Sequence, residues 1–359
     1  MNDPRLSDPR RGASPLVIHD PGDLVSAVPY MLGFHPSDSL VVIGCGGPRG
    51  SCALRYDLTL PPAAALHLTE VLALHGFRAA MLAGYGPRER VDPAIASAVR
   101  ALLAAGIEVH EAVRVHEGRF WSASCDRDGR GRELSTTALA AQAVLDGLVA
   151  LPDRDSLAAT ITPLPDPVRS RALRETRLVG GRVSVPEGLA LVRELARRLE
   201  RGRPPPSMPR IARLTVALSE IRVRDEAWVR IDPGSLPRHL EFWRHVLRRA
   251  APAHRAAPAS LFAYCAFTSG DGGLANLALD LALEDDPGYS MALLLRQAIA
   301  SGMHPSTAVI GLTPEDLAES YADPPEPHGR PAGTKRGARS SGKKKEEKPG
   351  GEGAYTLFE

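Results

Sequence analysis

Near the start of the chain, apolar side chains recur first at the spacing of a helix and then at the spacing of strands. The first apolar positions repeat at helical spacing, with Asp20 as N-cap, Pro21 at the first helical position and Gly33 as the stop signal. Residues 40–43 are continuously apolar, which is typical of a strand covered on both faces. Residues 52–60 alternate between apolar and polar side chains. We therefore predict a helix followed by a two-stranded hairpin.

Strand and helix patterns continue to alternate as far as residue 150. They predict a helix at 62–75, a strand at 79–83, a helix that begins at Asp92 and Pro93 and stops at Gly106, a hairpin of 107–115 and 119–124, and a helix at 135–150. Mixed helices and strands over this length indicate a layered α/β domain with a mixed sheet, which we place at residues 15–151.

The strand patterns end after Pro152. Ala275, Leu279, Ala282 and Pro287 recur at the offsets used by tetratricopeptide repeats, and small residues there favour close packing of antiparallel helices. We predict an all-α, repeat-like helical domain at residues 152–322. Its expected helices, separated by Pro- or Gly-rich breaks, are 167–179, 186–201, 209–221, 236–249, 258–268, 272–284 and 288–301.

Positive charge is concentrated near the C-terminus. Residues 329–350 carry eight Lys or Arg against two Glu, a net charge of +6, although the whole chain sums to +2. Every lysine of the chain lies in this stretch, and the remainder uses arginine alone, so arginines elsewhere are poor evidence for phosphate binding. Residues 1–14 and 323–359 have compositions that predict disorder. The basic residues of this tail include Lys335, Arg336, Arg339, Lys343, Lys344, Lys345 and Lys348.

The composition favours a cytoplasmic protein. No apolar run approaches the roughly 18 residues that a membrane span needs, and the first residues lack the apolar stretch of a signal peptide. The four cysteines have no framework spacing, so we expect reduced thiols. No spacing of Cys and His indicates a closed metal site, and no motif identifies a cofactor.

Two glycine-rich loops are the first candidates for a ligand site. Each follows a predicted strand and contains Gly-Pro-Arg, and glycine permits close approach of a ligand to the backbone. If the two strands run parallel, both loops lie at one edge of the sheet, where α/β domains usually bind ligands. Tight turns explain the same glycines without a ligand, and we prefer that explanation. The candidate residues are Gly46, Gly47, Arg49, Gly84, Tyr85, Gly86 and Arg88.

The polar segment between the first helix and the first strand is an alternative site. His35, Asp38 and either Ser37 or Ser39 could supply a base, an orienting carboxylate and a nucleophile. One turn cannot point three neighbouring side chains at one atom, whereas Pro36 and its polar neighbours suit a turn from helix to strand. We therefore favour a structural turn, and we expect it at the opposite edge of the sheet from the two loops.

Several longer blocks resemble one protein family. The run PGDLVSAVPYMLGFHPSDSLVVIG is similar to the opening block of an actinobacterial domain-of-unknown-function family, DUF4192. GYGP, GRFWS, VRDEAW, HLEFWRHVLRRAAP and GDGGLANLALDLALEDDPGYSMALLL resemble its later blocks in the same order, so the resemblance spans residues 15–305. It implies no activity, cofactor or catalytic residue. The family often has further cysteines after the position of Cys125, but Asp126, Arg127 and Asp128 follow here, so no metal or redox site is expected there.

These observations favour a binding or adaptor protein. We expect the helical domain to contact a protein partner and the edge of the α/β domain to hold a small ligand. A hydrolase or transferase that uses the glycine-rich loop edge is the alternative, and it requires convergent titratable groups in a pocket. A third hypothesis is association with nucleic acid or an acidic partner through weak, salt-sensitive contacts of the basic tail.

Overall fold

The computed structural model describes residues 18–48, 50–122, 129–135 and 137–321. The described residues up to Tyr321 belong to one compact unit. The stretches for which disorder is predicted, together with Arg49 and Cys125, lie outside the described residues.

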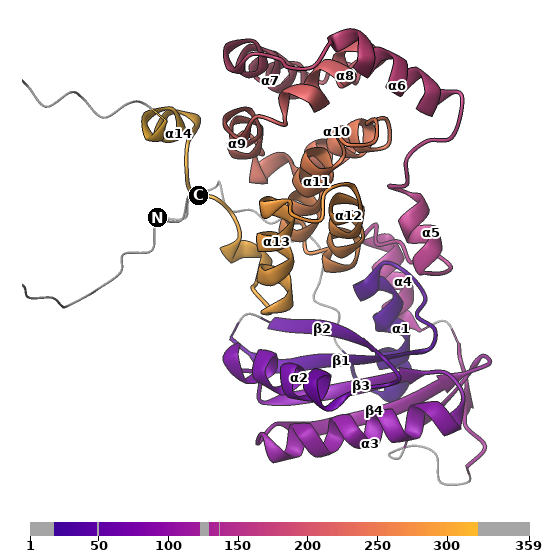
Figure 1. The fold of residues 1–359 in the computed structure, drawn as a ribbon. Coiled ribbons are helices and arrows are strands. Elements are labelled where there is room, and N and C mark those ends of the chain that lie inside the picture. Colours follow the sequence, from indigo (N-terminus) through magenta and orange to yellow (C-terminus); the bar gives the residue numbers. More distant parts are fainter. Residues whose placement is uncertain (1–17, 49, 123–128, 136, 322–359) are drawn as a thin grey trace, which may run out of the picture. The chain divides into compact units, whose positions relative to one another are not determined.

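A six-stranded mixed sheet forms the first half of the fold (Figure 1). Its strand order is β2-β1-β3-β4-β5-β6, and β3 with β4 is its parallel pair. The predicted hairpins are confirmed as the antiparallel pairs β1–β2 and β4–β5. The strands are β1 (Ser39–Gly47), β2 (Gly50–Asp57), β3 (Ala79–Tyr85), β4 (Glu108–His116), β5 (Arg119–Ser122) and β6 (Arg132–Glu133).

Helices cover both faces of this sheet. They are α1 (Pro21–Leu32), α2 (Pro62–Leu74), α3 (Arg88–Ala104) and α4 (Ala138–Leu145). Leu40 and Val42 of β1 belong to the hydrophobic core beneath α2 and α3. Val41 and Ile43, which point to the other face, belong to the core that contains α1. The prediction that this apolar run is a strand buried on both faces is therefore confirmed.

Local signals set the ends of α1. The backbone N–H of Asp23 donates to the Asp20 carboxylate at 2.9 Å, and Pro21 is the first helical residue. Gly33 ends the helix with a left-handed φ of +79°, a conformation that glycine adopts without strain. The predicted cap and stop are both confirmed.

Helix α3 begins earlier than the sequence pattern predicts. Its first residue is Arg88, with Pro87 at the N-cap position, so Asp92 and Pro93 lie inside the helix. The Asp92 carboxylate pairs with Arg88 at 3.0 Å, one helical turn away. Asp92, whose side chain suits an N-cap, is therefore an ion-pair partner inside the helix. Because α3 starts at Arg88, the loop after β3 is shorter than expected.

The second half of the fold is helical, as predicted. The sequence patterns do not predict its short helices α5, α9 and α14. In the part of the chain that the structure describes, no helix combines the length and the hydropathy that crossing a membrane requires. The helices are α5 (Arg154–Ala159), α6 (Val168–Val179), α7 (Val185–Glu200), α8 (Met208–Ala217), α9 (Ile221–Val229), α10 (Leu236–Leu247), α11 (Ala256–Thr268), α12 (Gly272–Asp285), α13 (Ser290–Ala300) and α14 (Pro314–Ser320), with 3₁₀ turns η2 (Pro233–Ser235) and η3 (Pro305–Thr307).

Helix α11 is central to the helical half (Figure 1). Its residues from Ala256 to Phe267 are buried, and α10, α12 and α13 pack against it. A helix that is apolar on all sides requires such enclosure. Ala275, Ala278 and Ala282 of α12 have no exposed surface, and these small side chains let α12 lie close to α11. One hydrophobic core runs from these helices to α1 and one face of the sheet.

Candidate functional site

The direction of the strands separates the two glycine-rich loops. β1 and β3 run antiparallel, and Ser39 at the start of β1 pairs with Tyr85 at the end of β3. The loop that follows β1 therefore lies at the other end of the sheet from the loop that follows β3. The prediction of one shared edge depended on parallel strands and is wrong. Periodicity locates a strand but does not determine the direction in which it joins a sheet.

Close packing accounts for one glycine in each loop. A Cβ at Gly47 would lie 2.6 Å from the ring of Phe77. A Cβ at Gly84 would lie 2.3 Å from Cγ1 of Val91, where α3 packs on the sheet. Both distances are shorter than van der Waals contact allows, so these positions require glycine for the fold itself.

The other described candidates from these loops differ in burial and in backbone conformation. Gly46 and Gly86 have φ angles of +71° and +139°, which favour glycine. Tyr85 is buried in the core, where loss of solvation raises the pKa of its hydroxyl. Arg88 is exposed on α3. Ligand binding by these loops stays a prediction, and the two loops do not come together in one site.

The segment from His35 to Ser39 turns the chain from α1 into β1. Asp38 adopts a φ of +42°, and its carboxylate accepts a hydrogen bond from Arg90 of α3 at 2.6 Å. His35 and Ser37 are exposed, whereas Ser39 is buried in β1. The contact with α3 places this turn beside the loop that follows β3, so the expectation that it lies away from both loops is wrong.

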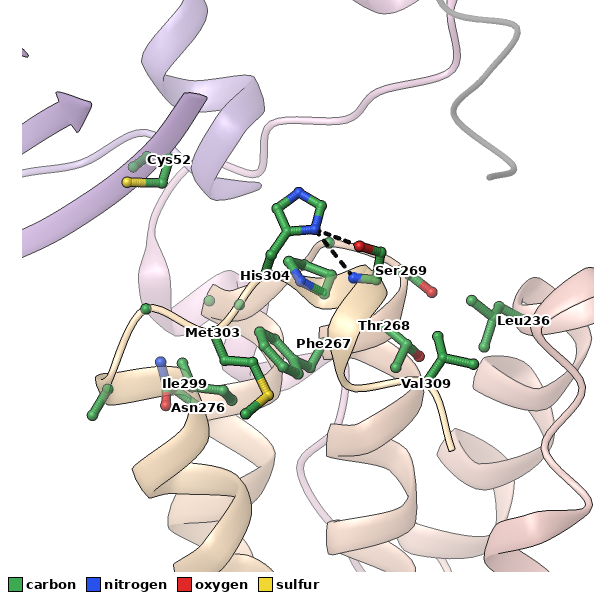
Figure 2. Close-up of a pocket in the computed structure, with 18 of the residues that line it drawn as sticks. Cys52, Leu236, Phe267, Thr268, Ser269, Asn276, Ile299, Met303, His304 and Val309 are labelled. Atoms are coloured by element: carbon green, nitrogen blue, oxygen red, sulfur yellow. Dashed lines mark hydrogen bonds between the residues drawn. The ribbon is translucent and has the colours of Figure 1, made fainter. Parts of the chain in front are cut away.

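A cleft of about 2000 Å³ lies between the sheet and the C-terminal helices (Figure 2). Its sheet wall consists of β2, α2 and the end of α1. Its helical wall includes the end of α11, α12, α13, residues 229–236 and residues 302–314. Cys52 belongs to the sheet wall, and Met303 and His304 belong to the helical wall. The volume exceeds the roughly 300–1000 Å³ of ordinary small-molecule sites, so the cleft suits a larger ligand.

Apolar side chains form much of the helical wall. Phe267, Ile299, Met303 and Val309 line it, and Leu236 of α10 lies farther along the cleft (Figure 2). Burial of apolar ligand surface against such side chains contributes about 25 cal/mol per Å². The wall can therefore bind the carbon-rich part of a ligand.

Of the four described arginines that line the cleft, three come from different elements and lie near one another. This arginine cluster consists of Arg55 of β2, Arg154 of α5 and Arg296 of α13. Asp280 of α12 accepts from Nη2 of Arg296 at 2.6 Å and from Nη2 of Arg154 at 3.3 Å. Nη1 of Arg55 lies 3.7 Å from Asp57, whose side chain is 79% exposed. Three guanidinium groups thus share two carboxylates, one of which is largely in solvent.

The positive charges of this cluster act on one another. Burial lowers the pKa of the Arg55 guanidinium, Asp57 opposes this effect, and the charge of Arg154 lowers the pKa further. The Nε atoms of Arg55 and Arg296 are buried without a hydrogen-bond partner among the described residues. A carboxylate or phosphate that reaches the cleft-facing ends of these guanidinium groups would add negative charge and charge-assisted hydrogen bonds.

His67 of α2 and His75, the residue that follows α2, connect the walls of the cleft. Nε2 of His67 lies 2.8 Å from the carbonyl oxygen of Ala300, and Nε2 of His75 lies 2.8 Å from that of Ser301. Because a carbonyl only accepts, Nε2 of His67 carries the proton. Nδ1 of neutral His67 then accepts from the Tyr56 hydroxyl at 3.1 Å. These bonds hold the end of α13 at a defined distance from the sheet.

The titratable groups of the cleft suit binding better than covalent catalysis. Burial raises the pKa of Cys52 to about 11, so its thiol is protonated at neutral pH and is a poor nucleophile. Asp232 lines the cleft, but its carboxylate accepts from the backbone of Gly234 and the hydroxyl of Ser235 in its own turn. The described lining therefore presents cations and apolar surface more than an activated base.

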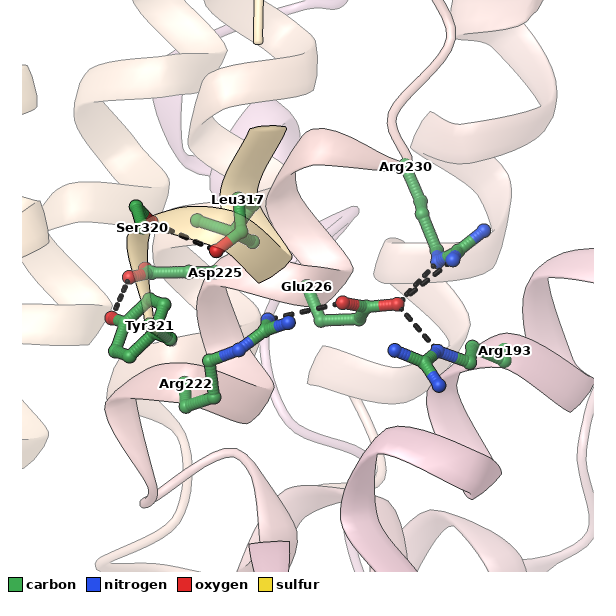
Figure 3. A network of polar contacts seen from close by, with 8 residues as sticks. All are labelled: Arg193, Arg222, Asp225, Glu226, Arg230, Leu317, Ser320 and Tyr321. Carbon is green, nitrogen blue, oxygen red and sulfur yellow. Dashed lines mark hydrogen bonds and ion pairs between the residues drawn. The ribbon is translucent and has the colours of Figure 1, made fainter. Parts of the chain in front are cut away.

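Glu226 of α9 forms an enclosed polar network next to the cleft (Figure 3). It has no exposed surface and accepts from Arg193 at 2.8 Å, Arg222 at 3.0 Å and Arg230 at 2.8 Å. Burial alone would raise its pKa, but the hydrogen bonds from Arg193 and Arg230 outweigh burial and hold the pKa below its ordinary value. Because Arg230 also lines the cleft, this network positions part of the lining.

Asp225, the residue before Glu226 in α9, binds the residue that follows α14. Asp225 accepts from the hydroxyl of Tyr321 at 2.8 Å (Figure 3). The guanidinium of Arg222 lies 4.9 Å from the centre of the Tyr321 ring, and Leu317 of α14 is buried. These contacts fix the chain beyond residues 302–314 and so hold that part of the helical wall in place.

A family model described as a domain of unknown function, DUF4192, matches residues 21–306. The chain belongs to this family. The DUF4192 match includes both walls of the cleft up to residue 306 and all three residues of the arginine cluster. It confirms the resemblance seen in the sequence blocks. No curated protein matches the chain, and no solved structure matches it.

Sequence patterns did not identify the arginine cluster of this DUF4192 protein. Arg55, Arg154 and Arg296 are far apart in the chain and occupy a strand, a short helix and a long helix. Arginine is the sole basic type besides histidine before Lys335, so composition gave none of the three special weight. Only the position of Arg55 on an alternating strand offered a local signal.

Proposed function

We propose that this DUF4192 protein is a binding protein whose cleft holds a ligand with an anionic group. The observation that carries the proposal is the convergence of Arg55, Arg154 and Arg296 on one cleft, where Asp280 is shared by two of them. Guanidinium groups recognise carboxylates and phosphates through paired, charge-assisted hydrogen bonds. The proposal therefore puts the ligand between β2 and α13, near the arginine cluster.

The balance of interactions supports an anion at this point. Each hydrogen bond to a charged group contributes about 1.5–3 kcal/mol when it replaces a solvated group. An anion beside Arg55 and Arg154 would also offset the repulsion between them. The apolar helical wall would bury the remainder of the ligand, so charge and apolar contact act on different parts of one molecule.

Compounds retained by the protein provide the first test. Native protein is purified at low salt and denatured, and the released compounds are identified by mass spectrometry. We expect the wild type to release a compound with a carboxylate or phosphate, and the Arg154→Gln and Arg296→Gln variants to release much less. Arg213→Gln is the matched control, because Arg213 is half exposed on α8 and pairs with Glu187 at 3.2 Å outside the cleft.

Calorimetric titration with citrate and with pyrophosphate provides the second test. The wild type and Arg213→Gln should bind at least one of these anions, and Arg154→Gln should bind it at least tenfold more weakly. Equal binding by all three proteins contradicts the proposal. The proposal is also contradicted if the wild type releases no anionic compound and binds neither citrate nor pyrophosphate.

A further inference from the structure

The cleft runs along the outer edge of the sheet. β2 is the first strand in the sheet order, and its sheet neighbour is β1. Six consecutive residues of β2, from Ser51 to Tyr56, line the cleft. Successive side chains of a strand point to opposite faces, so consecutive residues all line one cavity only where it opens along the strand's edge. The backbone N–H and C=O groups on this side of β2 therefore face the cleft.

The outer side of β2 has no strand partner among the described residues. Among the described elements, β1 alone makes extensive contact with β2. Pro and charged side chains commonly prevent an edge strand from pairing with another chain; β2 has no Pro between Gly50 and Asp57, and its charged residues are Arg55 and Asp57 near its C-terminal end. The walls of the cleft enclose the edge instead.

We propose that the cleft accepts an extended segment of a partner protein, which adds to β2 as a further strand and places an acidic side chain against Arg55 and Arg154. The proposal rests on the anion-binding function above and names its ligand class. Backbone hydrogen bonds to β2 supply affinity that is independent of sequence, and the arginine cluster supplies selectivity for Asp or Glu.

The dimensions and the charges of the cleft favour a peptide over a compact molecule. A strand of eight residues presents an edge of about 26 Å at roughly 3.3 Å per residue, which an extended peptide can follow along its length. Arg55 lies near the C-terminal end of this edge, so the acidic side chain has a defined position in the bound segment. Ile299 and Met303 on the helical wall face the region that apolar side chains of the same segment would occupy.

Peptide selection followed by backbone modification tests the proposal. The full-length protein is used to select nine-residue peptides from a random display library, and synthetic versions of the enriched peptide are measured by fluorescence anisotropy. We expect a shared Asp or Glu among the selected peptides. N-methylation of every second residue in one register should weaken binding at least tenfold, because it blocks pairing with β2. N-methylation in the other register should change affinity less than threefold.

A double-mutant cycle between the peptide's Glu and Arg154 tests whether these two groups interact directly. Replacement of the peptide's Glu by Gln should weaken binding to the wild type and to Arg213→Gln about tenfold, but should weaken binding to Arg154→Gln less than about threefold, because only Arg55 then remains beside the acidic position. Amide hydrogen exchange of residues 50–57 should slow when the peptide is bound. The proposal is overturned if no peptide is enriched, if the enriched peptides share no acidic residue, or if both N-methylated forms bind as well as the parent.

Two outcomes separate this inference from the function on which it rests. If citrate or pyrophosphate binding depends on Arg154 while N-methylation has no effect in either register, the anion site stands and strand addition fails. If these anions and the acidic peptide bind Arg154→Gln as well as they bind the wild type, both the anion site and the peptide inference fail.

Discussion

His67 and Ala300 are 233 residues apart in the chain, yet the imidazole Nε2 of His67 donates to the carbonyl oxygen of Ala300 at 2.8 Å. His67 belongs to α2, which packs on the sheet, and Ala300 is the last residue of α13. The last carbonyls of a helix have no partner within it, so this bond satisfies one of them. It also sets the distance between the two walls of the cleft.

Removal of this imidazole is expected to weaken the fold modestly. His67→Ala should lower the free energy of unfolding by about 1 kcal/mol, because the Ala300 carbonyl and the Tyr56 hydroxyl both lose a partner near solvent. Urea unfolding measures the change. His110→Ala is the control, since His110 is exposed on β4 with Glu108 3.5 Å away. If the two variants are equally stable, the connection between the walls does not contribute to stability.

Gly302, which follows α13, approaches α2 too closely for any side chain. Its φ is +72°, and a Cβ would lie 2.5 Å from Cγ1 of Val71. Gly302→Ala should therefore lower the free energy of unfolding by about 2 kcal/mol or more, from left-handed strain together with overpacking. Gly311→Ala is the matched control, because a Cβ there would meet no described atom within 4 Å. Thermal unfolding curves that shift equally for both variants would exclude this close approach.

The Glu226 carboxylate is expected to stabilise the helical half in a pH-dependent manner. Glu226→Gln should lower the free energy of unfolding by about 3 kcal/mol at pH 7, because three arginines lose a buried negative charge. The pKa of folded Glu226 is below the ordinary 4.5, so its stabilisation is complete above that pH and is lost as the pH falls through the folded-state pKa.

Urea unfolding of the wild type and Glu226→Gln at pH 7 and at about pH 3.5 measures this effect. The difference between the two proteins should shrink at the lower pH, because the wild-type carboxylate is then mostly protonated in the unfolded chain, about one unit below its ordinary pKa of 4.5. Glu241→Gln, on an exposed side chain that pairs with Arg244, should change stability by less than about 1 kcal/mol at either pH. A constant difference for Glu226→Gln across the pH range would argue against a charged carboxylate in the network.

Cys52 should react slowly despite its place in the cleft. With a pKa of about 11, its thiolate fraction at pH 8 is about 100-fold smaller than that of an ordinary cysteine. Labelling with iodoacetamide, followed by peptide mass spectrometry, should show this difference between native protein and protein in urea. The native rate should rise about tenfold per pH unit between pH 7 and 10. Rapid native labelling at pH 7 would contradict a buried, protonated thiol.

Elements that depend on neighbours along the chain could be predicted from the sequence. Asp20 and Gly33 mark the ends of α1 because a cap and a left-handed stop involve residues only a few positions apart. The apolar run of β1 indicated burial on both faces because side-chain period and burial are linked directly. The sequence blocks indicated the family, and the match to DUF4192 confirmed that assignment.

Tertiary structure alone decided the direction of β3 against β1, the helical position of Asp92 and the cleft itself. Asp92 is an acceptable N-cap by type, and the earlier start of α3 prevailed because the packing of that helix on the sheet outweighs a local preference. Arg55 and Arg154 are ordinary surface residues in the sequence. They come together in the arginine cluster because the shared hydrophobic core brings β2 and α5 together, and distances between such distant residues are set by packing and not by local pattern.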